Sequence, residues 1–251
     1  MKRFYLITSL ITSCLLWGCR GDNSHNLFIR AKVTVHLPEY PYTVGYVTES
    51  NELLTPSTCI FIGTPLREFE SQFGAGLHIQ LGDSIKTVDN LYDFFTLIKK
   101  SLKHPVNMIP ICADKDADMA IINTIRNRCL FFGIRPIFVA KSKTGTLLCF
   151  NPVFSSTIVN KSASLLKLYV TNNGDCLFRE KRISQQNIVE HLTEYFTQTT
   201  TGCAIQVIYG RATTFEHYMS IITALQKIKY DKQNNNPDFI IDIVDNGIWP
   251  T

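Results

Sequence analysis

The 251-residue sequence lacks several features that would each assign it to a familiar class of protein. After residue 19 its apolar runs are only of strand length, which excludes a further membrane-spanning helix of about 20 residues. No run of Lys or Arg resembles a nucleic-acid patch, and the net charge is only +4. Nucleic acid is therefore not an expected partner.

The motifs of common enzyme classes are also missing. The sequence contains no HExxH, GxSxG, GxxxxGK[ST] or GxGxxG pattern, and its six His are scattered. Glu190-His191 and Glu216-His217 are adjacent pairs near predicted helix starts. Because neighbouring residues on a helix point about 100° apart, neither pair is suited to hold one metal ion. We predict no catalytic residues, no cofactor and no metal site.

Cysteine occurs eight times but never as CxxC. Six cysteines lie beyond Cys14 and Cys19, and an even number in an exported chain permits disulfides. However, Cys112, Cys129 and Cys203 lie within apolar strand or helix patterns. These patterns favour small buried thiols over a disulfide framework.

The first 19 residues have the pattern of an export signal. Lys2 and Arg3 precede the uncharged, largely apolar segment FYLITSLITSCLLWG. The end of this segment and the following Cys19 read LWGC, which resembles a bacterial lipobox, although Trp17 stands where a small residue is usual. We therefore predict lipidation of Cys19 and membrane attachment through its acyl chains. A secreted protein with another cleavage site, or an uncleaved anchor, is the alternative.

Two stretches of the chain follow the same order of predicted elements. The second stretch contains the strand LLKLYVT, an Asn-Gly turn, a short strand from Cys176, a helix over 184–196, the strand AIQVIYG, a helix over 213–229 and the strand FIIDIV. The first contains CIFIG, LHIQL, a helix over 87–103, VNMIPIC, a helix over 117–131 and PIFVA. Placing Ala113 on Gly210 aligns the later helices without a gap, with Ile122 on Met219 and Ile125 on Ile222. Such self-similarity predicts two related units.

Local signals refine several of these elements. The alternating pattern of LFIRAKVTVHLP predicts a strand over 27–38. Pro110 cannot donate a ladder hydrogen bond, which places the strand VNMIPIC at a sheet edge or a bulge. Thr213 and Glu216 have the spacing of a capping box that starts a helix.

We therefore predict an α/β fold with a mixed α+β sheet, organised as two repeated β-β-α-β-α-β units. The expected boundaries are a signal peptide and lipobox over 1–19, a polar tether over 20–30, a first unit over 31–145, a linker over 146–164 that includes the strand-like LLCF, and a second unit over 165–251. Two units of about 100 residues each agree with usual domain sizes.

The order of elements resembles the periplasmic domain of the ExbD/TolR family. VTNNGDCLFREKRIS is similar to the strand, Asn-Gly turn, strand and Ser-started helix of that family, and KVTVHLPE is similar to its opening Leu-Pro segment. VNMIPICADKDAD resembles its strand followed by an Ala-Asp-Lys motif, here Ala113, Asp114 and Lys115. The second unit has Gly210, Arg211 and Ala212 at the corresponding place.

The resemblance implies a non-enzymatic envelope protein that is accessory to energy-transducing biopolymer transport. In the family, a transmembrane helix carries an aspartate that takes part in proton passage. Residues 4–18 contain no carboxylate, so the resemblance implies the periplasmic module without its proton-handling part. The implied role of Asp114 and its neighbours is to hold a turn.

The resemblance also implies partners and a location. The expected partners are a motor or TonB-like protein or peptidoglycan, with the two units paired inside one chain or in a homodimer. The expected location is the periplasmic side of the cell envelope, with a lipid anchor in the inner or the outer membrane. Two alternatives stay open, namely a general envelope scaffold unrelated to a proton motor, and a secreted hydrolase without a recognisable motif.

Overall fold

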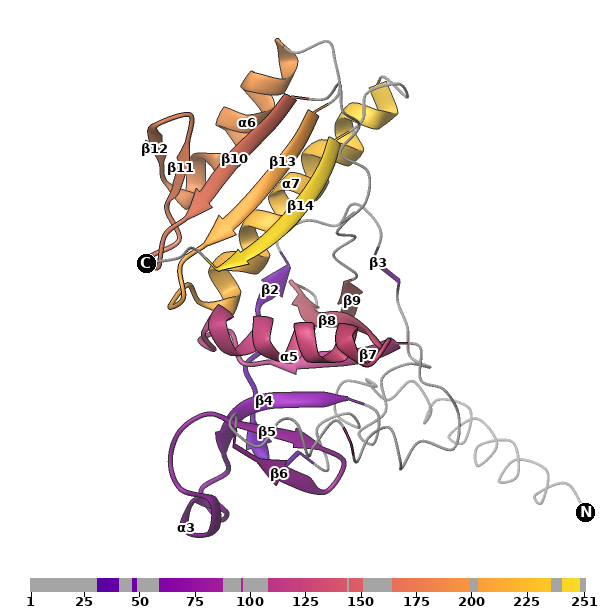
Figure 1. The fold of residues 1–251 in the computed structure, drawn as a ribbon, viewed down its shortest axis with the longest axis vertical. Coiled ribbons are helices and arrows are strands. Elements are labelled where there is room, and N and C mark those ends of the chain that lie inside the picture. The colour runs from indigo at the N-terminus through magenta and orange to yellow at the C-terminus, as the bar shows by residue number, and fades with distance from the viewer. Residues whose placement is uncertain are drawn as a thin grey trace, which may run out of the picture.

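The computed structural model describes residues 31–40, 47–48, 59–87, 96, 108–143, 145–150, 164–198, 203–235 and 241–248. These residues form two mixed β-sheets with helices (Figure 1), which confirms the predicted α/β fold class. The predicted signal segment, Cys19 and the tether lie outside them. None of the described helices has both the length and the apolar character needed to cross a membrane.

The first sheet is built from residues 33–150. Its strand order is β3 (Val47–Thr48), β9 (Leu147–Phe150), β8 (Arg135–Ser142), β7 (Met108–Ala113), β4 (Ile60–Pro65), β5 (His78–Leu81) and β6 (Ser84–Lys86). The short strands β1 (Val33–Thr34) and β2 (Glu39–Tyr40) pair with β4 and β8. Helix α5 (Met119–Phe131) connects β7 to β8, and the short α3 (Glu70–Phe73) precedes β5. Strand β9 extends this sheet into residues predicted to be linker.

The second sheet is built from residues 164–248. Its strand order is β12 (Lys181–Ile183), β11 (Cys176–Phe178), β10 (Ser164–Val170), β13 (Cys203–Tyr209) and β14 (Ile241–Ile248). A 3₁₀ turn, η2 (Gln185–Asn187), leads into α6 (Ile188–Thr197), and α7 (Phe215–Asn235) connects β13 to β14. Figure 1 shows α6 and α7 on the same face of this sheet.

Five strands have the same order and direction in both sheets. The order β6-β5-β4-β7-β8 in the first sheet corresponds to β12-β11-β10-β13-β14 in the second. In each set the first two pairs are antiparallel and the last two are parallel. The second unit has three strands before its first helix, where two were predicted. The predicted helix over 87–103 lies outside the described residues except for residues 87 and 96.

One apolar core includes residues of both units. It contains Ile111 and Ile122 from the first unit together with Leu168 and Leu225 from the second, all of them buried. The rings of Phe138 on β8 and Phe215 on α7 are 5.2 Å apart in an edge-to-face arrangement, a favourable geometry for an aromatic pair. The two units therefore pack as one body, joined by side chains that are far apart in the sequence.

Within the described residues 31–38, the strand predicted over 27–38 is confirmed only at Val33 and Thr34, which form β1. Only Val33 and Thr34 pair with a neighbouring strand in the described part of this segment. The backbone N–H of Lys32 donates instead to the Gln80 side chain, and that of His36 donates to Asp114. The alternation does identify the inward side chains, because Val33 is buried in a second, smaller core on the other face of the first sheet.

The edge position predicted from Pro110 is wrong, since β7 lies between β4 and β8. The β7–β8 ladder includes Pro110, whereas the β7–β4 ladder begins only at Ile111. A proline is tolerated where no partner strand requires its missing N–H. Because β4 begins opposite Ile111, no residue of β4 is paired with Pro110.

We expect Phe138→Ala to lower the free energy of unfolding by about 3–5 kcal/mol, because it empties a fully buried site between the two units. Phe131→Ala is the matched control, since that ring is 76% exposed and its loss should cost less than about 1 kcal/mol. Urea unfolding followed by circular dichroism measures both. Equal costs for the two variants would contradict the shared core.

Candidate functional site

The Ala-Asp-Lys motif lies where the two units meet. Three residues after the motif, Asp118 forms an isolated antiparallel bridge with Thr214, the residue before α7. The backbone N–H of Met119 donates to the carbonyl of Thr213, and the N–H of Phe215 donates to the carbonyl of Ala117, both at 2.8 Å. The first N–H groups of a helix have no partner within the helix. Here each helix start is capped by the loop that precedes the other helix.

A second pair of hydrogen bonds extends this exchange. The backbone N–H of Ala120 donates to the carbonyl of Arg211 at 3.2 Å, and the backbone N–H of Glu216 donates to the carbonyl of Lys115 at 2.9 Å. Residues with equivalent roles are 96 positions apart in the chain, as Ala120 and Glu216 are. The predicted alignment, which placed Ala113 on Gly210, is therefore shifted by one residue relative to the hydrogen-bonded pairs.

The predicted capping box of α7 is wrong. Its helix begins one residue later, and the hydroxyl of Thr214 accepts the N–H of His217 at 3.3 Å. The Thr213 hydroxyl donates to the carbonyl of Thr171 instead. Because a carbonyl from the first unit caps the N–H of Glu216, a local side-chain cap is unnecessary at that position.

Asp114 links its own loop to the segment that contains His36. Its Oδ2 accepts the backbone N–H of His36 at 2.8 Å and lies 2.9 Å from the His36 Nδ1. Its Oδ1 accepts the N–H of Asp116 at 3.0 Å, and the Lys115 N–H donates to the His36 carbonyl at 2.7 Å. These contacts engage both carboxylate oxygens and support the predicted role in holding the turn.

The six described cysteines are free thiols and are buried. Burial raises the pKa of both Cys129 and Cys176 to about 12, and the carboxylate of Asp175 adds to the rise at Cys176. Thiols with such pKa values stay protonated near neutral pH, and a protonated thiol is a poor nucleophile. Within the described ranges no group of three or more His, Cys, Asp or Glu side chains is arranged to hold a metal ion.

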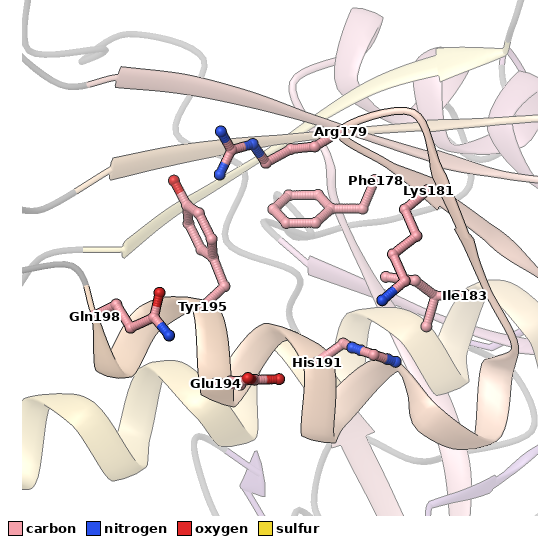
Figure 2. Close-up of a pocket in the computed structure, with 8 residues that line it drawn as sticks. All are labelled: Phe178, Arg179, Lys181, Ile183, His191, Glu194, Tyr195 and Gln198. Atoms are coloured by element: carbon pink, nitrogen blue, oxygen red, sulfur yellow. The ribbon is translucent and has the colours of Figure 1, made fainter.

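A groove of about 410 Å³ lies between the β11–β12 hairpin and α6. The hairpin contributes Phe178, Arg179, Lys181 and Ile183, and the helix with its C-cap residue contributes His191, Glu194, Tyr195 and Gln198. Figure 2 shows Arg179 reaching across the groove towards Tyr195, and Lys181 pointing towards the helix. Sequence analysis identified no site here.

The local geometry explains how these side chains converge. Phe178 faces Lys181 across the antiparallel β11–β12 pair, and side chains two residues apart on a strand share a face, so Lys181 and Ile183 point the same way. On α6 the lining residues His191, Glu194 and Tyr195 have the spacing i, i+3 and i+4, which places them on one side of the helix, and Gln198 follows as its C-cap. Buried Phe178 and Ile183 form the apolar floor.

The turn between β11 and β12 is strained. Arg179 and Glu180 have φ angles of 49° and 66°, and they are the positive-φ residues other than glycine in the described chain. Two-residue hairpin turns of this kind usually contain Asn and Gly, because a side chain in the left-handed region costs about 1 kcal/mol. The turn places the Arg179 guanidinium 5.4 Å from the centroid of the Tyr195 ring.

The charged groups of the groove are available to a ligand. In the part of the chain that the structure describes, the side chains of Lys181, His191 and Glu194 form neither a hydrogen bond nor an ion pair. Arg182 lies on the opposite strand face, where its Nη2 is 2.6 Å from Asp175 Oδ2. The groove therefore offers the unpaired Lys181 ammonium, the Arg179 guanidinium that contacts the Tyr195 ring, one carboxylate and an apolar floor.

The structure separates the groups that the sequence places side by side. His191 lines the groove with Glu194, one helical turn further on, rather than with its neighbour Glu190. The one sequence signal for the site was the turn itself, since Arg179-Glu180 supplies neither Asn nor Gly where β11 turns into β12. That signal is visible only once the strand ends are known.

A scan against protein-family models finds no matching family, and searches of curated proteins and of solved structures find no significant match.

We expect Asp114→Ala to lower the free energy of unfolding by about 1–2 kcal/mol, because it leaves two backbone N–H groups without their acceptor. Asp116→Ala is the control in the same loop. Its side chain is exposed, and its loss should change stability by less than about 0.5 kcal/mol. Urea unfolding of both variants tests this prediction, which fails if Asp114→Ala is as stable as Asp116→Ala.

Two substitutions in neighbouring turns should have opposite effects. Glu180→Gly should raise the free energy of unfolding by about 1 kcal/mol, because glycine relieves the left-handed φ. Gly174→Ala should lower it by more than about 1 kcal/mol, because Gly174 has φ 84° and a Cβ there would lie 2.7 Å from His217 Cδ2. Thermal and urea unfolding measure both, and a Glu180→Gly variant that is no more stable would argue against strain in that turn.

Proposed function

We propose that this chain is a non-enzymatic protein of the bacterial cell envelope that binds a protein partner and is accessory to energy-transducing transport. In this proposal its two ExbD/TolR-like units form an internal pair within one chain. A lipid on Cys19 holds the chain at the membrane, and both units face the periplasm. The function is binding rather than catalysis.

The observation that carries the proposal is the joint between the units. The same five-strand order occurs in both sheets, and reciprocal hydrogen bonds connect the two helix starts. The Ala-Asp-Lys loop, which carries the sequence resemblance, takes part in this joint through the Lys115 carbonyl. Each unit provides carbonyls that cap the helix start of the other unit, which is the arrangement expected of an internal pair.

The chemistry of the groove supports binding over turnover. Its polar side chains are a guanidinium, an ammonium, an imidazole, a carboxylate and an amide around an apolar floor. Cationic, anionic and apolar groups side by side are typical of a surface that recognises another molecule.

Affinity purification after cross-linking in the source bacterium tests the proposal. A tagged full-length chain should recover proton-channel or TonB-like components of a transport system, and Cys19→Ser should reduce that recovery severalfold because the anchor is lost. Light scattering on the purified chain is the control for the internal pair and should give the mass of one chain. Recovery of cell-wall material or envelope proteins without any transport component would instead favour a general scaffold, and a tight homodimer would contradict the internal pair.

A further inference from the structure

We propose that the groove between the β11–β12 hairpin and α6 binds a peptide segment that carries a single carboxylate flanked by apolar side chains. This inference rests on the proposed function, because it names the chemistry of the partner.

The charges select the ligand. Arg179 and Lys181 enter from the hairpin, and a guanidinium binds a carboxylate through two parallel hydrogen bonds. Glu194 lies on the helix side and makes no ion pair with any described residue. Its charge opposes a phosphate or a run of acidic residues, whereas it can accept the amide N–H groups of a peptide.

The apolar floor of the groove favours apolar side chains on either side of the ligand carboxylate. Phe178 and Ile183 are buried beneath the rim, and the Phe178 and Tyr195 rings are 5.3 Å apart in an edge-to-face contact. Because Phe178 and Ile183 expose little surface, an apolar side chain that entered the groove would mainly cover the partly exposed Tyr195 ring. A volume of about 410 Å³ is within the range of about 300–1,000 Å³ for small-ligand sites.

The turn supplies an independent observation. Strained backbone conformations cluster at functional sites, and this turn places the Arg179 guanidinium over the face of Tyr195. Glycine at either turn position would relieve the strain. The presence of Arg179 in such a turn is therefore consistent with use of its side chain.

Two variants of this turn separate binding from stability. Arg179→Gly and Glu180→Gly relieve strain at adjacent positions, but only Arg179→Gly removes a guanidinium from the groove. Both variants should fold at least as well as the wild-type chain. A loss of binding in Arg179→Gly alone therefore reports on the guanidinium.

Titration of the full chain with acetyl-Ala-Leu-Asp-Leu-Ala-amide, followed in the amide ¹H–¹⁵N spectrum, tests the proposal. We expect shifts confined to residues 178–183 and 191–198, and a Kd that rises about tenfold or more for Arg179→Gly and less than about twofold for Glu180→Gly. The peptide with Asn in place of Asp should also bind about tenfold more weakly. Absence of shifts, shifts elsewhere, or equal binding by Arg179→Gly would overturn the proposal.

Two further arms identify the ligand class and separate this inference from the proposed function. Acetate or inorganic phosphate that shifted the same amides at equal concentration would make the groove a general anion site and overturn the proposal. The Arg179→Gly variant is also used in the affinity purification after cross-linking. Unchanged recovery of transport components together with no peptide binding would refute the groove alone, whereas peptide binding without any transport component would refute the proposed function alone.

Discussion

The structure depends on the capping of α5 and α7 by each other's preceding loops. The first N–H groups of both helices lie at a buried junction, where an unpaired backbone group is costly. Carbonyls of Ala117 and Thr213 satisfy one N–H of each partner helix, and the apolar rings of Phe138 and Phe215 close the space beside them. Because each unit completes the hydrogen bonding of the other, their relative placement follows from the backbone as well as from the core.

The Ala-Asp-Lys loop, which carries the sequence resemblance, is part of the contact between the two units. Both oxygens of Asp114 are engaged by donors within the first unit, and the Lys115 carbonyl is engaged by α7. The motif loop is therefore part of the internal architecture. Exposed charged side chains lie instead at the β11–β12 turn. There Arg179 and Glu180 have a left-handed backbone conformation that residues with a side chain disfavour.

Much of the fold could be predicted because its signals are local. The periodic apolar positions of α5 and α7, the Asn-Gly turn before β11 and the β-branched runs of β13 and β14 each predict an element from neighbouring residues. Predictions failed where the deciding partner is distant in the chain. Segment 31–38 bonds to Gln80 and Asp114 rather than along a full ladder, and a carbonyl from the other unit caps Glu216 in place of a capping box.

The sequence by itself determined most of the described element types and the apolar periodicity of α5 and α7, because these follow from side-chain spacing along a few residues. Only the tertiary structure decided the one-residue shift between the equivalent loops, the central place of β7 despite Pro110, and the groove that joins the hairpin of 178–183 to one side of α6. Each of these depends on which backbone groups meet across distances of many residues. A local pattern of side chains does not encode that information.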